Sequence, residues 1–178
     1  MSLTQSPAPM APQFPPIGHG FEPPLREDIR PKVILCVAAS DAHVVGNHMI
    51  AMFLRDNGFE VVNLGAATPI EEIMDAHQKH PDVIAIIIGS LNGHAADDLA
   101  GLGIAKRDYQ VRCPVFLGGN LSVGSRKTSR EVDQLLSDGV NEIVNDPEKL
   151  LIKLKQLASG ASASVPQLPV QTAQQGTF

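Results

Sequence analysis

The chain has 178 residues, of which 43% are hydrophobic, and its formal net charge is −5. This length suits one domain with an ordinary hydrophobic core. No apolar run approaches the ~20 residues that span a bilayer, and the proline-rich N-terminus lacks the features of a signal peptide. We therefore expect a cytoplasmic protein without a membrane partner. The negative charge and the scarcity of aromatic residues argue against nucleic acid as a partner.

Three regions of the chain differ in composition. Residues 1–31 hold eight of the 14 prolines, which predicts an extended N-terminal tail. Residues 159–178 are rich in Ser, Ala and Gln, which predicts a disordered C-terminal tail. The folded unit is therefore expected at residues 32–158.

Predicted strands and helices alternate through this unit. In chain order the sequence predicts a strand at 32–38, a helix at 43–56, a strand at 59–64, a helix at 69–80, a strand at 82–88, a helix at 94–106, a strand at 114–117, a helix at 129–137, a strand at 142–144 and a helix at 147–157. The strands are nearly continuous apolar runs, which is typical of strands buried on both faces of a parallel sheet. These repeats favour an α/β fold: a flavodoxin-like, doubly wound five-stranded sheet of order 2-1-3-4-5 with helices on both faces.

Two loops of this predicted sheet carry polar residues at one crevice. The sheet order reverses between the first and third strands, so the loops after them flank a ligand site. Asp41 and His43 lie in one loop, and Gly89-Ser90-Leu91 lies in the other. A neutral imidazole binds a metal through one ring nitrogen, and a carboxylate on the other nitrogen fixes its tautomer. The alternative is an Asp that caps the next helix, with a His in its first turn; the position at the crevice favours the metal ligand.

Other ligands of this fold fit the sequence less well. A phosphoacceptor receiver needs an Asp closing its third strand and a Lys closing its fifth, where this chain has Gly89-Ser90 and Asn145. A flavodoxin needs a phosphate-binding loop after the first strand, and Asp41 would repel a phosphate there. The chain has neither a Walker A motif nor a dinucleotide fingerprint.

Three stretches of the chain match motifs of corrinoid proteins. They are Asp41-Ala42-His43-Val44-Val45-Gly46, Gly89-Ser90-Leu91 and Gly118-Gly119-Asn120. On these motifs the chain resembles the cobalamin-binding domains of the methionine synthase and mutase type. Longer matches are similar to the small, cobalamin-carrying subunits of glutamate mutase (methylaspartate mutase). They are residues 40–47, 58–65 and 118–124. The similarity covers residues 32–155.

The resemblance implies a cofactor, a partner and a set of site residues. The cofactor is adenosylcobalamin, bound with its own base displaced into a slot and with His43 as the metal ligand, oriented by Asp41. The implied activity is the interconversion of L-glutamate and 3-methylaspartate, with a large barrel-type partner subunit that binds the substrate. The chain itself then contributes no catalytic residue. The implied cofactor-binding residues are Ser40, Asp41, Ala42, His43, Val44, Gly46, Gly89, Ser90, Leu91, Gly118, Gly119, Asn120, Leu121, Ser122 and Val123.

The chain departs from the family pattern at the nucleotide slot. Gly89 stands where related proteins have a serine, so Ser90 or the shape of the slot must hold the base. After the fifth strand, Val144-Asn145-Asp146-Pro147 replaces a Pro-Gly-Thr-like turn. Two alternatives therefore stay open. One is a corrinoid carrier or sensor that is not a mutase subunit, and the other is a flavodoxin-like interaction module that has lost its cofactor.

Overall fold

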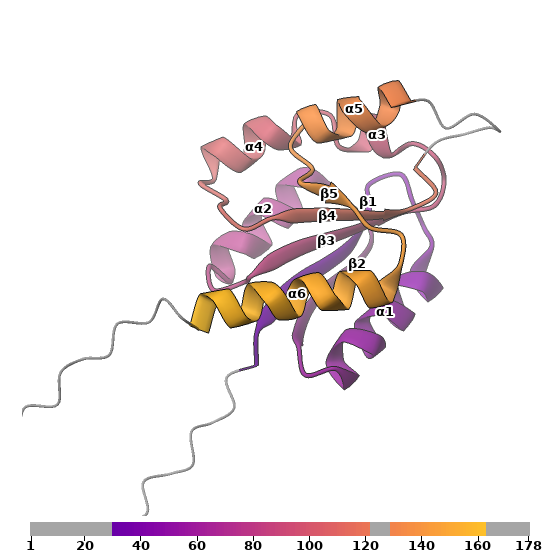
Figure 1. Cartoon of the computed structure of the whole chain (residues 1–178). Coiled ribbons are helices and arrows are strands. Elements are labelled where there is room, and N and C mark those ends of the chain that lie inside the picture. The colour runs from indigo at the N-terminus through magenta and orange to yellow at the C-terminus, as the bar shows by residue number, and fades with distance from the viewer. Residues whose placement is uncertain (1–29, 122–128, 163–178) are drawn as a thin grey trace, which may run out of the picture.

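The protein is described here from a computed structural model, which covers residues 30–121 and 129–162. It contains a five-stranded parallel sheet of order β2-β1-β3-β4-β5 (Figure 1). The strands are β1 (Lys32–Ala38), β2 (Glu60–Thr68), β3 (Ala85–Ser90), β4 (Val115–Gly119) and β5 (Glu142–Ile143). The helices are α1 (Val44–Asp56), α2 (Ile70–Lys79), α3 (Ala95–Asp98), α4 (Leu102–Asp108), α5 (Ser129–Ser137) and α6 (Pro147–Ser162). The predicted fold class and strand order are confirmed.

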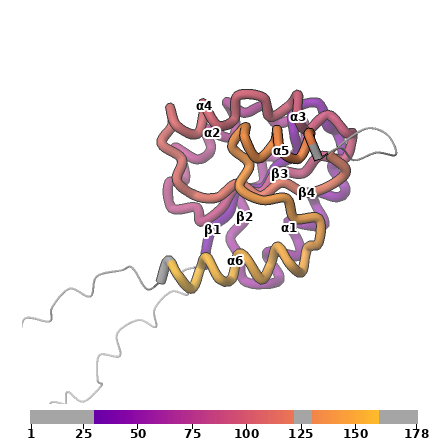
Figure 2. Tube along the Cα trace, turned by 45° about the horizontal axis from the view of Figure 1, so that its top comes forward, coloured from indigo at the N-terminus to yellow at the C-terminus, as the bar shows by residue number. Residues whose placement is uncertain are grey.

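The helices cover the two faces of the sheet in unequal numbers. Figure 2 shows α1 and α6 together on one side of the sheet and α2 to α5 on the other. One core cluster joins Val33, Leu35 and Ile87 to α1 and α6. The other joins Ile34 and Ile86 to α2–α5. Neighbouring residues of a strand point to opposite faces, so the continuous apolar runs of β1 and β3 supply both clusters.

Several element boundaries differ from the prediction. β2 continues to Thr68, past the positive-φ residue Gly65 (φ 91°), and the pairing with β1 shifts register there. β3 begins at Ala85 and extends to Ser90, so the predicted Gly89-Ser90 loop is the end of a strand. The predicted helix at 94–106 is two helices, because Gly101 adopts the left-handed conformation between them.

Two helix ends also differ. The sequence predicts this helix from residue 69, but α2 begins at Ile70 and no side chain caps it. Thr68 is buried as the last residue of β2. α6 runs to Ser162, beyond the predicted end of the helix and into the region expected to be a tail. No helix in the described ranges is both long and apolar enough to cross a membrane.

Candidate functional site

The carboxyl ends of β1 and β3 bring two loops together around Asp41. Its side chain is 1% exposed and accepts four hydrogen bonds. Oδ1 accepts from the backbone N–H of His43 at 3.0 Å and from Nδ1 of the same residue. Oδ2 accepts from the backbone N–H groups of Leu91 and Asn92, the latter at 3.2 Å. Asp41 therefore ties the His43 loop to the end of β3, as the topology predicts.

Hydrogen bonding decides the charge of Asp41. Burial alone would raise its pKa, but the Leu91 N–H, the His43 side chain and the other backbone donors outweigh burial and hold the pKa below its usual value. The ionised carboxylate keeps a proton on Nδ1 of His43 and leaves the lone pair on Nε2. The His43 side chain is 56% exposed, so the imidazole is oriented from inside and open to a ligand outside.

The Asp41 carboxylate should make part of the stability of the fold depend on pH. Its native pKa lies below the unfolded value of ~3.9, so its contribution is complete above about pH 4 and is lost as the pH falls through the native pKa. Asp41→Asn should cost about 2 kcal/mol of unfolding free energy at pH 7. The difference from the wild type should shrink below about pH 4 in urea unfolding.

Asp97→Asn is the matched control for this measurement, because Asp97 is exposed and lies outside the loop. Asp97→Asn should leave the unfolding free energy nearly unchanged at pH 7 and at pH 2.5. A constant difference between wild type and Asp41→Asn from pH 7 to pH 2.5 would contradict the role of the carboxylate.

An apolar slot opens beside His43. Its volume is about 290 Å³, and it lies between the carboxyl ends of β1, β3 and β4 and the helices α1 and α6. The predicted site residues that line it are His43, Gly46, Gly89, Leu91, Gly118 and Gly119. The slot is thus formed by all three motifs, and its size is near the lower end for ligand pockets.

Other predicted site residues lie outside the slot. Ser90 is fully buried, and its Oγ bonds Oδ1 of Asn92 at 3.4 Å. Because Gly89 and Ser90 alternate along β3, Ser90 points to the face opposite the slot. Ser40 is hydrogen-bonded to Asp98 and does not line the slot.

The remaining predicted residues divide into three groups. Ala42, Val44 and Asn120 are exposed and do not line the slot. Leu121 packs against the core cluster on the α2–α5 face. Ser122 and Val123 lie outside the described residues.

Two helices supply lining residues that sequence reasoning missed. α1 contributes Asn47, Met49 and Ile50, which follow Gly46 at helical spacing. α6 contributes Leu150, and it joins Asn145 and Pro147 from the segment that the sequence already predicts at the nucleotide slot. The α1 residues could have been found by following the helix face that begins at Gly46 of the Asp-x-His-x-x-Gly motif for one more turn. Leu150 carries no local signal, because only the fold brings it to the slot.

The slot has features that fit a large bound group. Gly46 and Gly89 have ordinary backbone conformations, and a Cβ added at Gly46 would meet only Leu91 Cδ1, at 3.8 Å, among the described atoms. The fold itself therefore does not require a glycine at position 46, whereas a ring that approaches the backbone closely there does. Asn47 Oδ1 is buried and has no hydrogen-bond partner in the described part of the chain. Such an acceptor is costly unless a ligand or water donates to it.

The orientation of Asn47 follows from its neighbours. The backbone N–H of Gly65 donates to Asn63 Oδ1 at 2.9 Å, which fixes that oxygen as an acceptor. Asn47 must then present Nδ2 to it, and does so at 2.8 Å. The unpaired atom of Asn47 is therefore the amide oxygen.

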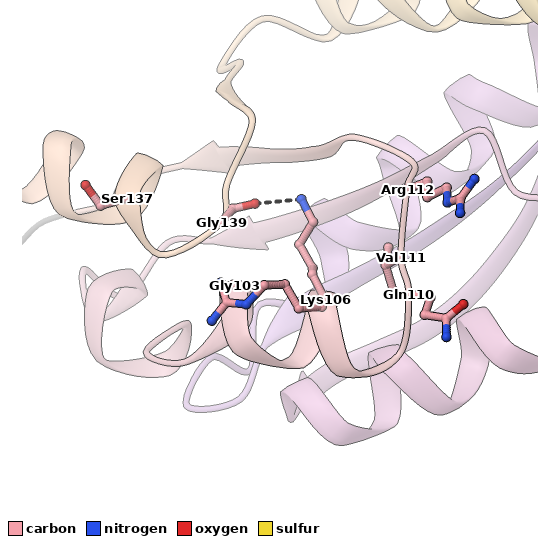
Figure 3. Close-up of a pocket in the computed structure, with 8 residues that line it drawn as sticks. Gly103, Lys106, Gln110, Val111, Arg112, Ser137 and Gly139 are labelled. Carbon is pink, nitrogen blue, oxygen red and sulfur yellow. Dashed lines mark hydrogen bonds between the residues drawn. The ribbon is translucent and has the colours of Figure 1, made fainter.

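A second cavity, of about 470 Å³, lies at the opposite end of the sheet (Figure 3). Lys106 Nζ donates to Gly139 O at 2.9 Å and to Asn141 Oδ1 at 2.8 Å, and burial lowers the pKa of this amine. Figure 3 shows Ser137 and Arg112 at opposite ends of the cavity. Its polar groups do not converge, and the smaller slot beside His43 is the better candidate site.

Comparison with known proteins agrees with this site. The model of the B12 binding domain matches residues 31–138. The chain belongs to the B12-binding domain family. The Asp41–His43 pair and most of the residues that line the slot lie within the matched range, so the resemblance seen in the three motifs is confirmed.

Relatives of this B12-binding domain include glutamate mutase sigma subunits. Sigma subunit 1 of Haloarcula marismortui is 38% identical over 127 residues, which cover 70% of this chain and 83% of that protein. The sigma subunit of Fusobacterium nucleatum is 31% identical over 130 residues, covering 70% and 94%. These matches confirm the expected similarity to the small subunits of glutamate mutase.

Solved structures agree with the fold. A cobalamin-binding protein from Desulfitobacterium hafniense superposes with a TM-score of 0.59 at 18% identity, covering 72% of this chain and 60% of that one. The methanol:cobalamin methyltransferase complex of Methanosarcina barkeri gives 0.56 at 21% identity, covering 75% and 47%.

Proposed function

We propose that this chain is the cobalamin-binding subunit of a glutamate mutase, which interconverts L-glutamate and 3-methylaspartate. The observation that supports this most directly is the Asp41–His43 pair at the slot of a B12-binding domain. The similarity to sigma subunits along most of their length supports the choice of reaction.

In this proposal the cofactor is adenosylcobalamin, bound with its own base displaced from cobalt. His43 Nε2 would hold the cobalt, and Asp41 would set the tautomer and direction of the imidazole. The apolar slot takes the displaced nucleotide base.

Among the described residues no three His, Cys, Asp or Glu side chains are grouped to hold a metal ion. A single protein ligand suits a metal whose other ligands come from an organic ring. When bound, the cofactor supplies the cobalt–carbon bond whose cleavage starts the rearrangement.

The proposal assigns the substrate to a large barrel-type partner subunit. Val45, Met49 and Met52 are exposed along α1, next to the slot, at 75%, 65% and 57%. An apolar stripe of this kind next to a binding site is typical of a surface covered by another protein. The isolated chain should therefore bind the cofactor and turn over no glutamate.

The test starts with the purified chain and adenosylcobalamin. The complex should stay together through gel filtration and show the visible spectrum of a cobalt that carries a nitrogen ligand from the protein. Adding the large subunit of a related glutamate mutase should then give 3-methylaspartate. Binding without turnover in that mixture would favour a corrinoid carrier or sensor. Failure to retain cobalamin would favour an interaction module without cofactor.

Gly89 offers a way to improve nucleotide binding. A Cβ added there would lie in ordinary contact with Cys36 O at 3.7 Å and Val37 Cγ2 at 3.8 Å, and Gly89 lines the slot. Ser90 cannot take over the missing hydroxyl without leaving its buried position on the opposite face. Gly89→Ser should tighten cobalamin binding about fivefold to tenfold, the scale of one hydrogen bond. Calorimetric titration measures this change.

Gly89→Ala is the matched control, because it adds the Cβ without the hydroxyl. It should bind cobalamin no more tightly than the wild type. Cobinamide, which lacks the nucleotide, should bind equally to all three proteins. Equal gains for Ser and Ala, or a gain for cobinamide, would contradict a hydroxyl contact with the base.

A further inference from the structure

We propose that Asp98 is a positioning residue for the cobalt ligand, acting through Ser40 and Asn92 on the loop that carries His43. The inference rests on the proposed role of His43. It adds Asp98 and Asn92, which the matched motifs do not include, to the residues behind the cobalt ligand.

Asp98 holds Ser40, the second residue of the loop after β1, with both carboxylate oxygens. Oδ2 accepts from Ser40 Oγ at 2.8 Å, and Oδ1 accepts from the Ser40 backbone N–H at 3.2 Å. The two residues are 58 positions apart in sequence. The short helix α3 brings the carboxylate to this place, with Ala95 and Leu99 anchoring that segment in the core.

Asn92 completes the network from the other loop. Its Nδ2 donates to Ser40 O at 2.9 Å and to Ser40 Oγ at 2.7 Å. Its backbone N–H donates to Asp41 Oδ2 at 3.2 Å. Its Oδ1 accepts from the backbone N–H of His94 at 3.0 Å, which fixes the orientation of the amide.

The hydrogen bonds of the Ser40 hydroxyl can run in only one set of directions. An ionised carboxylate only accepts hydrogen bonds, so the Ser40 hydroxyl must donate to Asp98 and accept from Asn92. The Ser40 backbone is held at its N–H by Asp98 and at its C=O by Asn92. Both ends of this residue are fixed three positions before His43. The direction of the imidazole therefore depends on Asp98, which itself does not line the slot.

The position of Asp98 separates this role from general stability. Its side chain is only partly buried, and the core contacts of its segment come from the neighbouring apolar residues Ala95 and Leu99. Asp98→Ala removes two hydrogen bonds at the surface and leaves those apolar contacts intact. We expect the hydrophobic core to stay folded while the loop that carries His43 becomes more mobile.

The experiment compares full-length wild type, Asp98→Ala and Asp97→Ala, each loaded with cob(II)alamin. Electron paramagnetic resonance reports whether a nitrogen is bound to cobalt, and ¹⁵N-labelled histidine assigns that nitrogen to the protein. The wild type should be nitrogen-coordinated. In Asp98→Ala the coordinated fraction of the bound cofactor should fall clearly, and cobalamin affinity should fall about tenfold, the lower end for residues that orient a metal ligand. Asp97→Ala, which removes the adjacent exposed carboxylate, should match the wild type.

Asp98→Asn is a second variant, because it retains one acceptor oxygen for Ser40 and should give an intermediate coordinated fraction. It carries the test if Asp98→Ala fails to fold. An unchanged coordinated fraction in the folded Asp98 variants overturns this inference, even if affinity falls. A wild type that binds no cobalamin, or binds it without a histidine nitrogen, overturns the proposed function instead.

Discussion

Replacing His43 with alanine should leave bound cobalamin without a nitrogen ligand from the protein. The imidazole is oriented by Asp41 and open on its other side, and no other histidine lines the described slot. Residues that only orient a ligand account for ~10–100-fold in metal affinity, so loss of the ligand should cost about 100-fold or more. Visible spectra of the loaded protein measure the coordination, and a cobalamin titration measures the affinity.

Three further variants give this experiment its controls. His48→Ala removes an exposed histidine of α1 that does not line the slot, and it should change neither spectrum nor affinity. Asp41→Asn should act more mildly than His43→Ala, because the imidazole remains. His43→Gly leaves room for added imidazole, which should restore a nitrogen-coordinated spectrum. An unchanged spectrum in His43→Ala would show that His43 is not the ligand.

Gly119→Ala should be among the most destabilising single changes in the chain. Gly119 ends β4 beside Ser90 of β3, at φ 120°, a conformation that side chains rarely adopt. An added Cβ would overlap the backbone oxygen of Ser90 and push the two strands apart at the slot. Overpacking and backbone strain together should cost about 3 kcal/mol or more in unfolding free energy. Urea unfolding measures this loss.

Gly160→Ala is the matched control for that change. Gly160 lies in α6 without positive φ, and a Cβ there would meet nothing within 4 Å in the described structure. Alanine in a helix is favoured over glycine by ~1 kcal/mol, so this variant should be as stable as the wild type or slightly more stable. Equal stability of Gly119→Ala and the wild type would mean that the end of β4 relaxes without cost.

The order of strands and helices follows from the sequence for a simple reason. Strands buried on both faces must be apolar at nearly every position, and the runs at 33–37 and 85–88 are. Right-handed crossovers then restrict five such strands to few arrangements. The boundary errors fall where backbone geometry overrides the pattern, as at Gly65 within β2 and Gly101 between α3 and α4.

The site was predictable only in its local part. Asp41 and His43 are two positions apart, so their hydrogen bond is a property of one loop and can be expected from the motif. The sequence alone did not decide on which face of the sheet Ser90 lies, because the predicted strand ended at residue 88. Extending β3 by two residues fixes the alternation and sends Ser90 away from the slot.

By itself, the sequence determined the fold class, the strand order, the family and the Asp41–His43 pair. These depend on periodicity and on short spacings, which are written locally in the chain. Only the tertiary structure decided that Leu150 reaches the slot and that Asp98 holds Ser40. Such contacts join residues whose distance along the chain is unrelated to their distance in space. They depend on the packing of whole elements, which no local pattern records.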